Sequence, residues 1–255
     1  MIMWPTARAF DVWRRNLECW KRFAASYLVS VLGTPIFYLL GVGYGLGRFV
    51  ADIGGVPYAV FLTPGVIAFA AVNSATFETT IGSFTRMAEQ NTYAAILATP
   101  CSVADIVAGD VLWAASKSLI ATCFVLLVSA CVGLLSSPLA LGLVPVGFLT
   151  GLMFGALGMV VTAKAPSYDF FNYYFTLVFS VMFFFSGIFF PVSSLPDWAR
   201  WVAWVVPLTH AVSVSRALAT ATLGPAVLGD VVWMVVVTAA AFVVAERLVR
   251  RRMLV

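Results

Sequence analysis

The stretch FLTPGVIAFAAVNSATFETTIGSFTRMAEQNTYAAILATPCSVADIVAGDVLWAASKSLIATCFVLLVSACV, residues 61–132, decides the fold. It contains two apolar runs on either side of a polar segment from Arg86 to Asp110. A helix needs about 20 mostly apolar residues to cross the hydrocarbon of a bilayer, and each run is long enough. The runs are continuous and do not alternate with a period of two, so they predict helices rather than strands. We therefore expect a helical hairpin in a membrane, with a polar tip between its two arms.

The composition of the whole chain is that of an integral membrane protein. Of its 255 residues, 62% are hydrophobic and 10% are charged, whereas about 25% of residues are charged in soluble domains. The mean hydropathy is +1.00. So little charge cannot cover a domain that faces water on all sides. We expect an all-α membrane protein, with residues 1–255 forming a single transmembrane domain.

Six apolar segments are long enough to cross the membrane as helices. One of them carries glycine every four residues, at Gly147, Gly151 and Gly155, which predicts a small-residue face for close helix packing. The predicted spans are residues 23–46, 58–84, 103–134, 139–163, 170–190 and 226–245.

Two further segments are helical but do not fit a full crossing. Residues 6–22 carry apolar side chains at spacings of three and four, with charged residues on the opposite face, which predicts an amphipathic helix at the membrane surface. Residues 195–223 contain two apolar stretches, each too short to cross. We expect two re-entrant half-helices there, supported by neighbouring protein or a wet cavity.

The basic residues predict the orientation. Six spans bring both termini and two loops to one side, which then holds far more Lys and Arg than the other side. The positive-inside rule places that side, with both termini, in the cytoplasm. The basic residues predicted on the cytoplasmic side are Arg8, Arg14, Arg15, Lys21, Arg22, Arg86, Lys164, Arg247, Arg250, Arg251 and Arg252. Those predicted on the other side are Arg48, Arg200 and Arg216.

The polar tip has its own helix signals. Residues 87–98 predict a short helix, which Thr99-Pro100 ends because the residue before proline avoids the helical region. Ser102 and Asp105 then have the spacing of a capping box, which predicts the start of the next helix.

Two residues of opposite charge lie at similar depth in the predicted second and third spans. Glu78 is near the inner end of the second span and Lys117 near the inner end of the third, so their depths match. A charge at that depth costs free energy unless it is paired or hydrated. We expect Glu78 and Lys117 to pair, or Lys117 to reach Asp110 two turns away; such a pair is either structural or part of a gate.

The half-helix segment carries the polar and aromatic residues of the outer side. Trp198, Trp201 and Trp204 recur every three residues, which favours an aromatic belt at the interface over a surface that stacks on sugar or lipid. His210 is interpreted as a hydrogen-bonded structural residue. With Arg216, these residues are the candidates for an outer gate.

Several kinds of site are missing from the sequence. There is no GxxxxGK[ST] phosphate loop, no HExxH motif, no cluster of metal-spaced histidines and no GxSxG motif. The four cysteines form no CxxC pair. The basic residues flank spans instead of lining a groove, which argues against nucleic acid. We predict no catalytic, cofactor or metal site in this chain.

The order of these segments resembles that of the permease subunits of ABC-type exporters in the polysaccharide and drug-export class. The motifs ATFETT (75–80), AILATP (95–100), DIV (105–107) and LWAASK (112–117) resemble one branch, the permeases that export nodulation factors, which are lipooligosaccharides. The resemblance extends over essentially the whole chain.

The resemblance implies a homodimer in the bacterial inner membrane, in contact with lipids and with two copies of a separate ATPase that binds ATP and Mg²⁺. It also implies that residues 87–98 are a coupling helix seated in a groove of the ATPase, and that the substrate is a lipid-linked oligosaccharide or a similar amphiphile taken from the inner leaflet. A drug or lipid efflux permease is the alternative. An ion-coupled secondary transporter is less favoured, since no inverted repeat is visible. The implied ATPase contacts are Arg86, Glu89, Gln90, Tyr93, Ile96 and Leu97.

Overall fold

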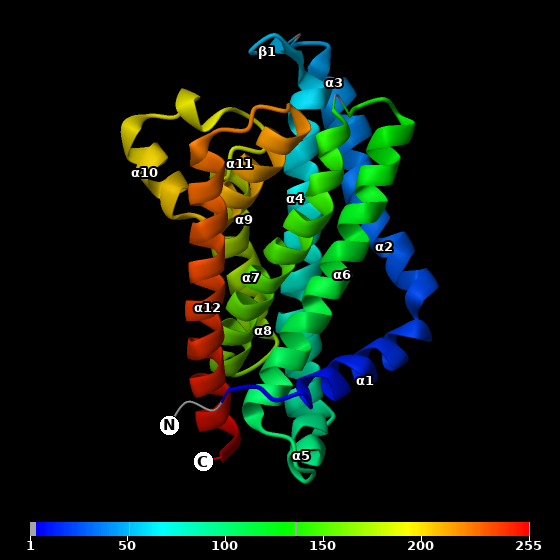
Figure 1. Ribbon diagram of the computed structural model, residues 1–255, viewed down its shortest axis with the longest axis vertical. Helices are drawn as coiled ribbons and strands as arrows, with labels where there is room; N and C mark the ends of the chain where they lie inside the picture. Colours follow the sequence, from blue (N-terminus) through cyan, green and yellow to red (C-terminus); the bar gives the residue numbers. More distant parts are fainter. Residues whose placement is uncertain (1–3, 51, 136, 255) are drawn as a thin grey trace.

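The computed structural model describes residues 4–50, 52–135 and 137–254, and they form an elongated bundle of helices (Figure 1). The helices α4, α6, α7 and α12 run along the long axis of the bundle. The bounds of these four are Tyr58–Phe77 for α4, Val103–Cys131 for α6, Leu143–Lys164 for α7 and Pro225–Leu254 for α12.

The first predicted span is a helix in three parts. It begins as α2 (Ala24–Ile36), widens into the π-helix η1 (Phe37–Tyr44) just after Pro35, and ends in the short α3 (Gly45–Gly47). A proline inside a helix removes one backbone hydrogen bond and disturbs the turn, which explains the change of helix type there. A hairpin of β1 (Asp52–Ile53) and β2 (Val56–Pro57) then leads to α4.

The second span continues beyond α4 through two more π-helical segments, η2 (Glu78–Gly82) and η3 (Thr85–Glu89). The helix predicted over residues 87–98 is interrupted: residues 87–89 belong to the end of η3, and Asn91 then takes a left-handed backbone with φ of 51°. Only the short α5 (Thr92–Leu97) forms the tip helix. The capping box is confirmed: Ser102 Oγ accepts from the Asp105 amide, and Asp105 accepts from the Ser102 amide, at the start of α6.

In the second half of the chain, α11 and α12 pack against α7. The one-turn 3₁₀ helix η4 (Pro138–Gly142) leads into α7, and α8 (Asp169–Tyr173), η5 (Tyr174–Phe179) and α9 (Ser180–Phe185) form the fifth predicted span. After η6 (Val192–Ser194), α10 (Asp197–Val205) and α11 (Pro207–Ala219) meet at an angle of 90°. This bend lies where two half-helices are predicted.

Among the described residues, four helices are long and apolar enough to cross a membrane, and the bent pair α10–α11 would make five. The protein is therefore an all-α membrane protein, and the count of six crossings stays a prediction.

Small residues bring α7 against α6, as the glycine spacing predicts. A Cβ atom at Gly151 would lie 2.6 Å from the Ser118 Cβ, closer than real side chains approach. Ser118 in turn donates to the Ala71 carbonyl of α4 over 2.6 Å. Close backbones with hydroxyl groups between them are the usual way for helices to associate in a membrane.

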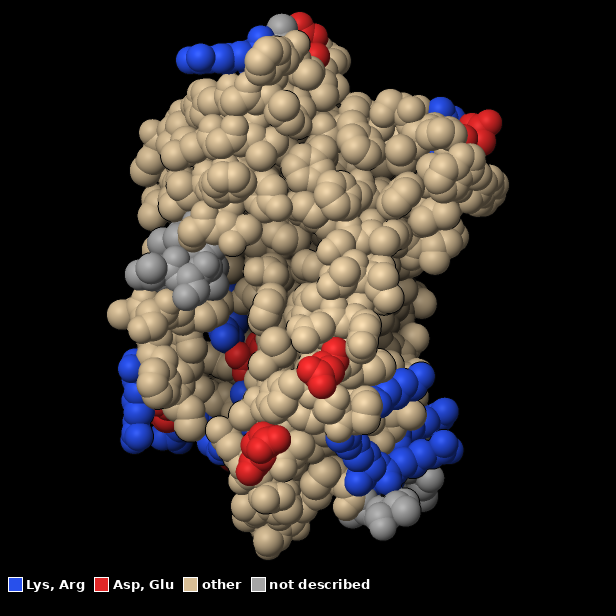
Figure 2. All heavy atoms as spheres, turned by 180° about the vertical axis from the view of Figure 1, so that it is seen from behind, with Lys and Arg blue, Asp and Glu red and all other residues tan. Residues whose placement is uncertain are grey.

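The first and last described residues lie at one end of the bundle together with α1 (Ala9–Lys21) and α5, while α10 and the β-hairpin lie at the other end (Figure 1). In Figure 2 the Lys and Arg atoms gather over the end that holds the termini. This distribution has the asymmetry that the positive-inside rule describes.

Candidate functional site

The candidate site is a cluster of charged and polar side chains where the lower end of α4 and its π-helical extension meet α6. Glu78 is the first residue of η2, and Arg86 lies two turns further on in η3. On α6, Asp110 and Lys117 are seven residues apart and so lie on one face of the helix. We call Glu78, Arg86, Asp110 and Lys117 the charge cluster.

Glu78 holds both cations of the charge cluster. Its Oε1 atom lies 2.7 Å from Arg86 Nη1, and its Oε2 atom lies 2.8 Å from Lys117 Nζ. The Glu78 side chain is only 9% exposed. The alternative in which Lys117 reaches Asp110 is not the arrangement in this structure.

Asp110 is the second acid of the cluster and is almost completely buried, with 1% of its side chain exposed. Its Oδ2 atom accepts from Arg86 Nη2 (3.1 Å), Ser83 Oγ (2.8 Å) and Tyr93 Oη (2.5 Å). Its Oδ1 atom accepts from Asn16 Nδ2 (2.7 Å). One carboxylate therefore joins α1, η3, α5 and α6.

The cluster contains two carboxylates and two cations, so it can be buried as a neutral unit. Arg86 bridges the two acids, with one nitrogen on Glu78 and another on Asp110. A buried charge is tolerated when it is paired and hydrogen-bonded, but removing one partner leaves an uncompensated charge. Lys117 also lies 4.0 Å from the centre of the Tyr27 ring, which brings α2 into the same site.

The N-terminal helix α1 docks on α6 beside the cluster. A Cβ at Gly109 would lie 2.5 Å from the Val12 Cβ, so glycine is needed for this close approach. Trp13 Nε1 donates to Ser116 Oγ over 2.9 Å, and the Thr6 amide donates to Asp105 over 2.6 Å.

The docking face of α1 only partly coincides with the apolar stripe of the sequence, Phe10, Trp13, Leu17 and Trp20: Trp13 bonds to Ser116 and Trp20 packs edge-on against Trp113. The structure buries Ala9, Val12 and Asn16, while Phe10, a member of the predicted stripe, is 57% exposed. Sequence reasoning missed this small and partly polar face of α1, because the role of Asn16 is visible only once its partner Asp110 is known.

The residues predicted to contact an ATPase separate into three groups. Arg86 and Tyr93 point into the charge cluster, so their side chains are engaged inside the protein. Ile96 and Leu97 are partly buried against the core under the tip. Glu89 and Gln90 are exposed, as are the small residues of α5 beside them, Ala94 and Ala95.

Tyr93 links the exposed tip to the cluster. Burial, and then the neighbouring Asp110 carboxylate, raise the pKa of Tyr93 well above its usual value. Its phenol therefore stays protonated and donates its hydrogen bond. A movement of α5 would be passed to Asp110 through this bond.

Two hollows flank this region. A cavity of about 450 Å³ is lined by Asn16, Glu78 and Arg86 together with Phe23 and Trp113. Figure 2 shows a hollow in which acidic and basic atoms are visible within a mostly uncharged face. A second cavity of about 400 Å³ lies between α1 and α5 and is lined by residues of both helices.

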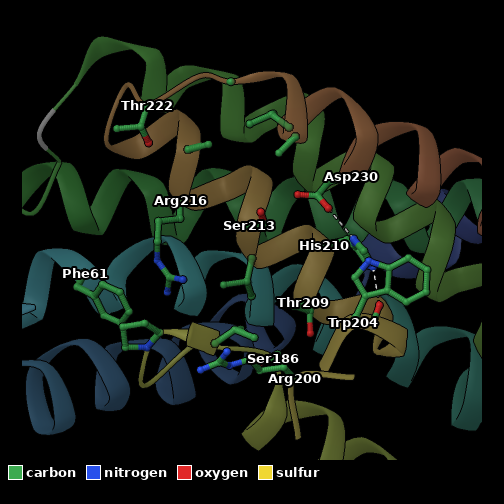
Figure 3. A pocket seen from close by; sticks show the side chains of 17 residues that line it. Phe61, Ser186, Arg200, Trp204, Thr209, His210, Ser213, Arg216, Thr222 and Asp230 are labelled. Carbon is green, nitrogen blue, oxygen red and sulfur yellow. Dashed lines mark hydrogen bonds and ion pairs between the residues drawn. The ribbon is translucent and has the colours of Figure 1, made fainter. Parts of the chain in front are cut away.

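Of the residues predicted for an outer gate, Trp204, His210 and Arg216 line a cavity of about 650 Å³ at the opposite end of the bundle (Figure 3). His210 Nδ1 lies 2.7 Å from Asp230 Oδ1, and its Nε2 lies 2.8 Å from the Trp204 carbonyl oxygen. Trp198 and Trp201 project outward from α10, with 65% and 74% of their area exposed. The structure thus separates the predicted gate residues from the charge cluster.

Comparison with known proteins gives consistent matches. The family described as ABC-2 type transporter matches residues 10–219. Nodulation protein J of Sinorhizobium fredii is 43% identical over 205 residues, covering 80% of this chain and 78% of that protein. Nodulation protein J of Rhizobium meliloti is 42% identical over 207 residues, covering 81% and 79%. The inner membrane transport permease YadH of Escherichia coli is 22% identical over 217 residues, covering 81% and 80%.

Proposed function

This chain belongs to the ABC-2 type transporter family, in the nodulation protein J branch, and we propose on that premise how it works as the transmembrane permease of an ABC exporter. The tip formed by α5 and the end of η3 is the contact for a separate ATPase. The charge cluster passes the motion of that tip to the helices that cross the membrane.

The observation that carries this proposal is the attachment of the tip. The surface of α5 is exposed, yet its buried Tyr93 donates to Asp110, and Asp110 shares Arg86 with Glu78. The tip is therefore connected by short polar contacts to α1, α6 and the extension of α4. A tip that only linked two helices would need no such connection.

The ATPase is a separate chain in this proposal, and ATP and Mg²⁺ bind there. The cavity between α1 and α5 is lined by Asp11, Arg15 and Gln90 among others. It offers a mixed acidic and basic surface beside the tip, which suits a polar contact with a soluble protein. Helix α1 would brace the same contact.

We infer that two copies of this chain form the path. The segments η1 and α8–α9 carry large apolar side chains on the surface, such as Phe37, Tyr44, Tyr173 and Phe184, each between 47% and 66% exposed. Such a face needs lipid or another protein to cover it. In the proposal, the first and fifth spans lie near the seam between the two copies.

The proposed substrate is a lipid-linked oligosaccharide or a similar amphiphile from the inner leaflet. The name nodulation protein J supports the substrate class through the branch to which the chain belongs. The proposed location is the bacterial inner membrane, with both termini cytoplasmic, which the name of the Escherichia coli relative and the basic residues around the termini support.

Ion-coupled transport is not favoured by the charge cluster. Glu78 is held by two cations, and Asp110 by one cation and three neutral donors. A carboxylate that carries a proton across the membrane must be able to release its partners, and these are bound tightly.

The experiment is co-purification of the chain with a candidate ABC ATPase subunit from the same organism. Glu89→Arg and Ala95→Arg, at exposed positions of the tip, are expected to abolish co-purification and transport while leaving the folded yield unchanged. Asp52→Arg is the matched control, because it reverses an exposed charge at the other end of the bundle. The coupling assignment is wrong if both tip variants still bind the ATPase and transport normally.

A further inference from the structure

The cavity between α10, α11 and α12 holds a cation that lacks an acidic partner. It has a volume of about 650 Å³, within the range of cavities that enclose small ligands. Arg216 of α11 lines it, and Figure 3 shows the guanidinium beside Phe61. The charge cluster lies at the far end of the bundle, so this cavity is a separate site.

Most of the hydrogen-bonding capacity of Arg216 is unused. Its Nη2 atom donates to the Gly187 carbonyl over 2.8 Å, and its guanidinium lies 4.0 Å from the centre of the Phe61 ring. Its Nε–H is buried and has no hydrogen-bond partner. Across the described parts of the chain, no carboxylate lies within 4.0 Å of this guanidinium. Since guanidinium carries five donors and no acceptor, the group is suited to an oxyanion.

A second buried donor lines the same cavity. The Thr209 hydroxyl is buried and has no hydrogen-bond partner. Thr209 and Arg216 are seven residues apart on α11, which places them on one face of the helix. Among the described residues, nine buried side-chain nitrogen or oxygen atoms have no hydrogen-bond partner, and two of them, Arg216 Nε and Thr209 Oγ1, belong to residues that line this cavity, where a ligand would satisfy them.

The charges around the cavity favour an anion. Arg200 also lines the cavity, but its Nη1 lies 3.3 Å from Asp197 Oδ1 and it donates to the Leu195 and Ser193 carbonyls, so Arg216 is the cation of the lining that is left for a ligand. The acid of the lining, Asp230, is already held by His210. The remaining walls are largely apolar, and the exposed tryptophans of α10 beside the cavity are typical of the membrane interface.

We propose that this cavity binds the anionic headgroup of an amphiphile, with phosphate or carboxylate oxygens held by Arg216 and Thr209. The apolar walls and the interfacial α10 accommodate the start of the acyl chain. The proposal concerns binding by this chain alone, and it stands whether or not the chain exports an oligosaccharide.

The test uses the full-length chain, purified in a zwitterionic detergent, and native mass spectrometry to count bound lipid. The probes are dioleoyl phosphatidylglycerol and dioleoyl phosphatidylcholine, which share their acyl chains and differ in net charge. The wild-type protein is expected to bind the anionic lipid at least about tenfold more tightly than the zwitterionic one. Arg216→Gln should remove that preference, a loss of roughly tenfold to a hundredfold that matches removal of a charge-assisted hydrogen bond.

Arg48→Gln is the control, because Arg48 is exposed near the same end and lies outside the cavity. A third arm adds inorganic phosphate: displacement of the lipid by phosphate assigns the site to the oxyanion itself, and no displacement assigns it to the whole lipid headgroup. Should Arg216→Gln fail to fold, Thr209→Val keeps the shape and is expected to weaken the anionic lipid several-fold. Equal binding of the two lipids by the wild-type protein, or an undiminished preference in the Arg216 and Thr209 variants, overturns the proposal.

Discussion

Replacing Glu78 by glutamine removes the carboxylate that holds both Arg86 and Lys117. The Glu78 side chain is 9% exposed and those of Arg86 and Lys117 are 14% and 12% exposed, so water screens the remaining cations little. Removing one partner from a buried ion pair costs about 3–5 kcal/mol. For a chain of this size that cost corresponds to a fall of roughly 6–20 °C in the unfolding midpoint.

The assay is thermal unfolding of the purified protein in detergent, followed by the fluorescence of its tryptophans. The double variant Glu78→Gln with Lys117→Gln restores equal numbers of positive and negative charges, and it should recover about 1–3 kcal/mol relative to the sum of the single changes. Exchanging the two residues is a poorer test, because a lysine at position 78 would face Arg86.

Glu18→Gln is the matched control. Glu18 pairs with Lys21 at the surface, and this neighbouring ammonium lowers the pKa of Glu18, yet both side chains are more than half exposed. Exposed pairs contribute little, so the midpoint should not move. If Glu78→Gln behaves like this control, or if the double variant is no more stable than additivity predicts, the charge cluster does not hold the helices together as argued.

Three further changes test the contacts around the cluster. Tyr93→Phe removes one of the hydrogen bonds to Asp110 and should cost about 1–3 kcal/mol of stability, measured as a lower unfolding midpoint. At temperatures where this variant is still folded, its transport rate should nevertheless fall below that of the wild-type protein. Gly151→Leu inserts a side chain where α7 meets Ser118 of α6, and overpacking of about 1–3 kcal/mol or more should lower the monodisperse yield on size-exclusion chromatography. Ser102→Ala removes the cap of α6 and should cost about 0.5–2 kcal/mol, seen as faster amide exchange in the first turn of that helix.

Local patterns in the sequence were sufficient to predict the main helices of the molecule. The apolar runs indicate where the long helices lie, and the capping box marks the start of α6. The two short apolar stretches before the last span indicate the bend between α10 and α11. Each of these features depends on neighbouring residues, so a single sequence contains the information.

The interior of the candidate site could be predicted only in part. Glu78 and Lys117 lie at similar depth in neighbouring spans, which can be predicted by counting residues along each span. In the structure, Glu78 Oε2 lies 2.8 Å from Lys117 Nζ. The inward turn of Arg86 could not be seen, because it depends on π-helical segments that rotate the end of the second span. The link from Asn16 to Asp110 joins residues 94 positions apart and requires the docking of α1.

The tip helix is shorter than predicted because of one backbone conformation, which the amino-acid composition of the segment does not reveal. Asn91 adopts a left-handed conformation that asparagine tolerates better than most residues, and the helix restarts after it. The shorter α5 leaves Ala94 and Ala95 as its exposed face. Small side chains there would let a partner approach the backbone closely.

The central claim is that the α5 tip meets the ATPase on the cytoplasmic side, and site-directed cross-linking tests it most directly. In a background with the native cysteines replaced, Ala95→Cys and Asp52→Cys place single thiols at opposite ends of the bundle. The account predicts that the Ala95→Cys thiol cross-links to the ATPase and is protected from impermeant thiol reagents in intact cells. The Asp52→Cys thiol should react with those reagents and should not cross-link to the ATPase. Labelling of position 95 from outside, or cross-linking of the ATPase to position 52 instead, would contradict it.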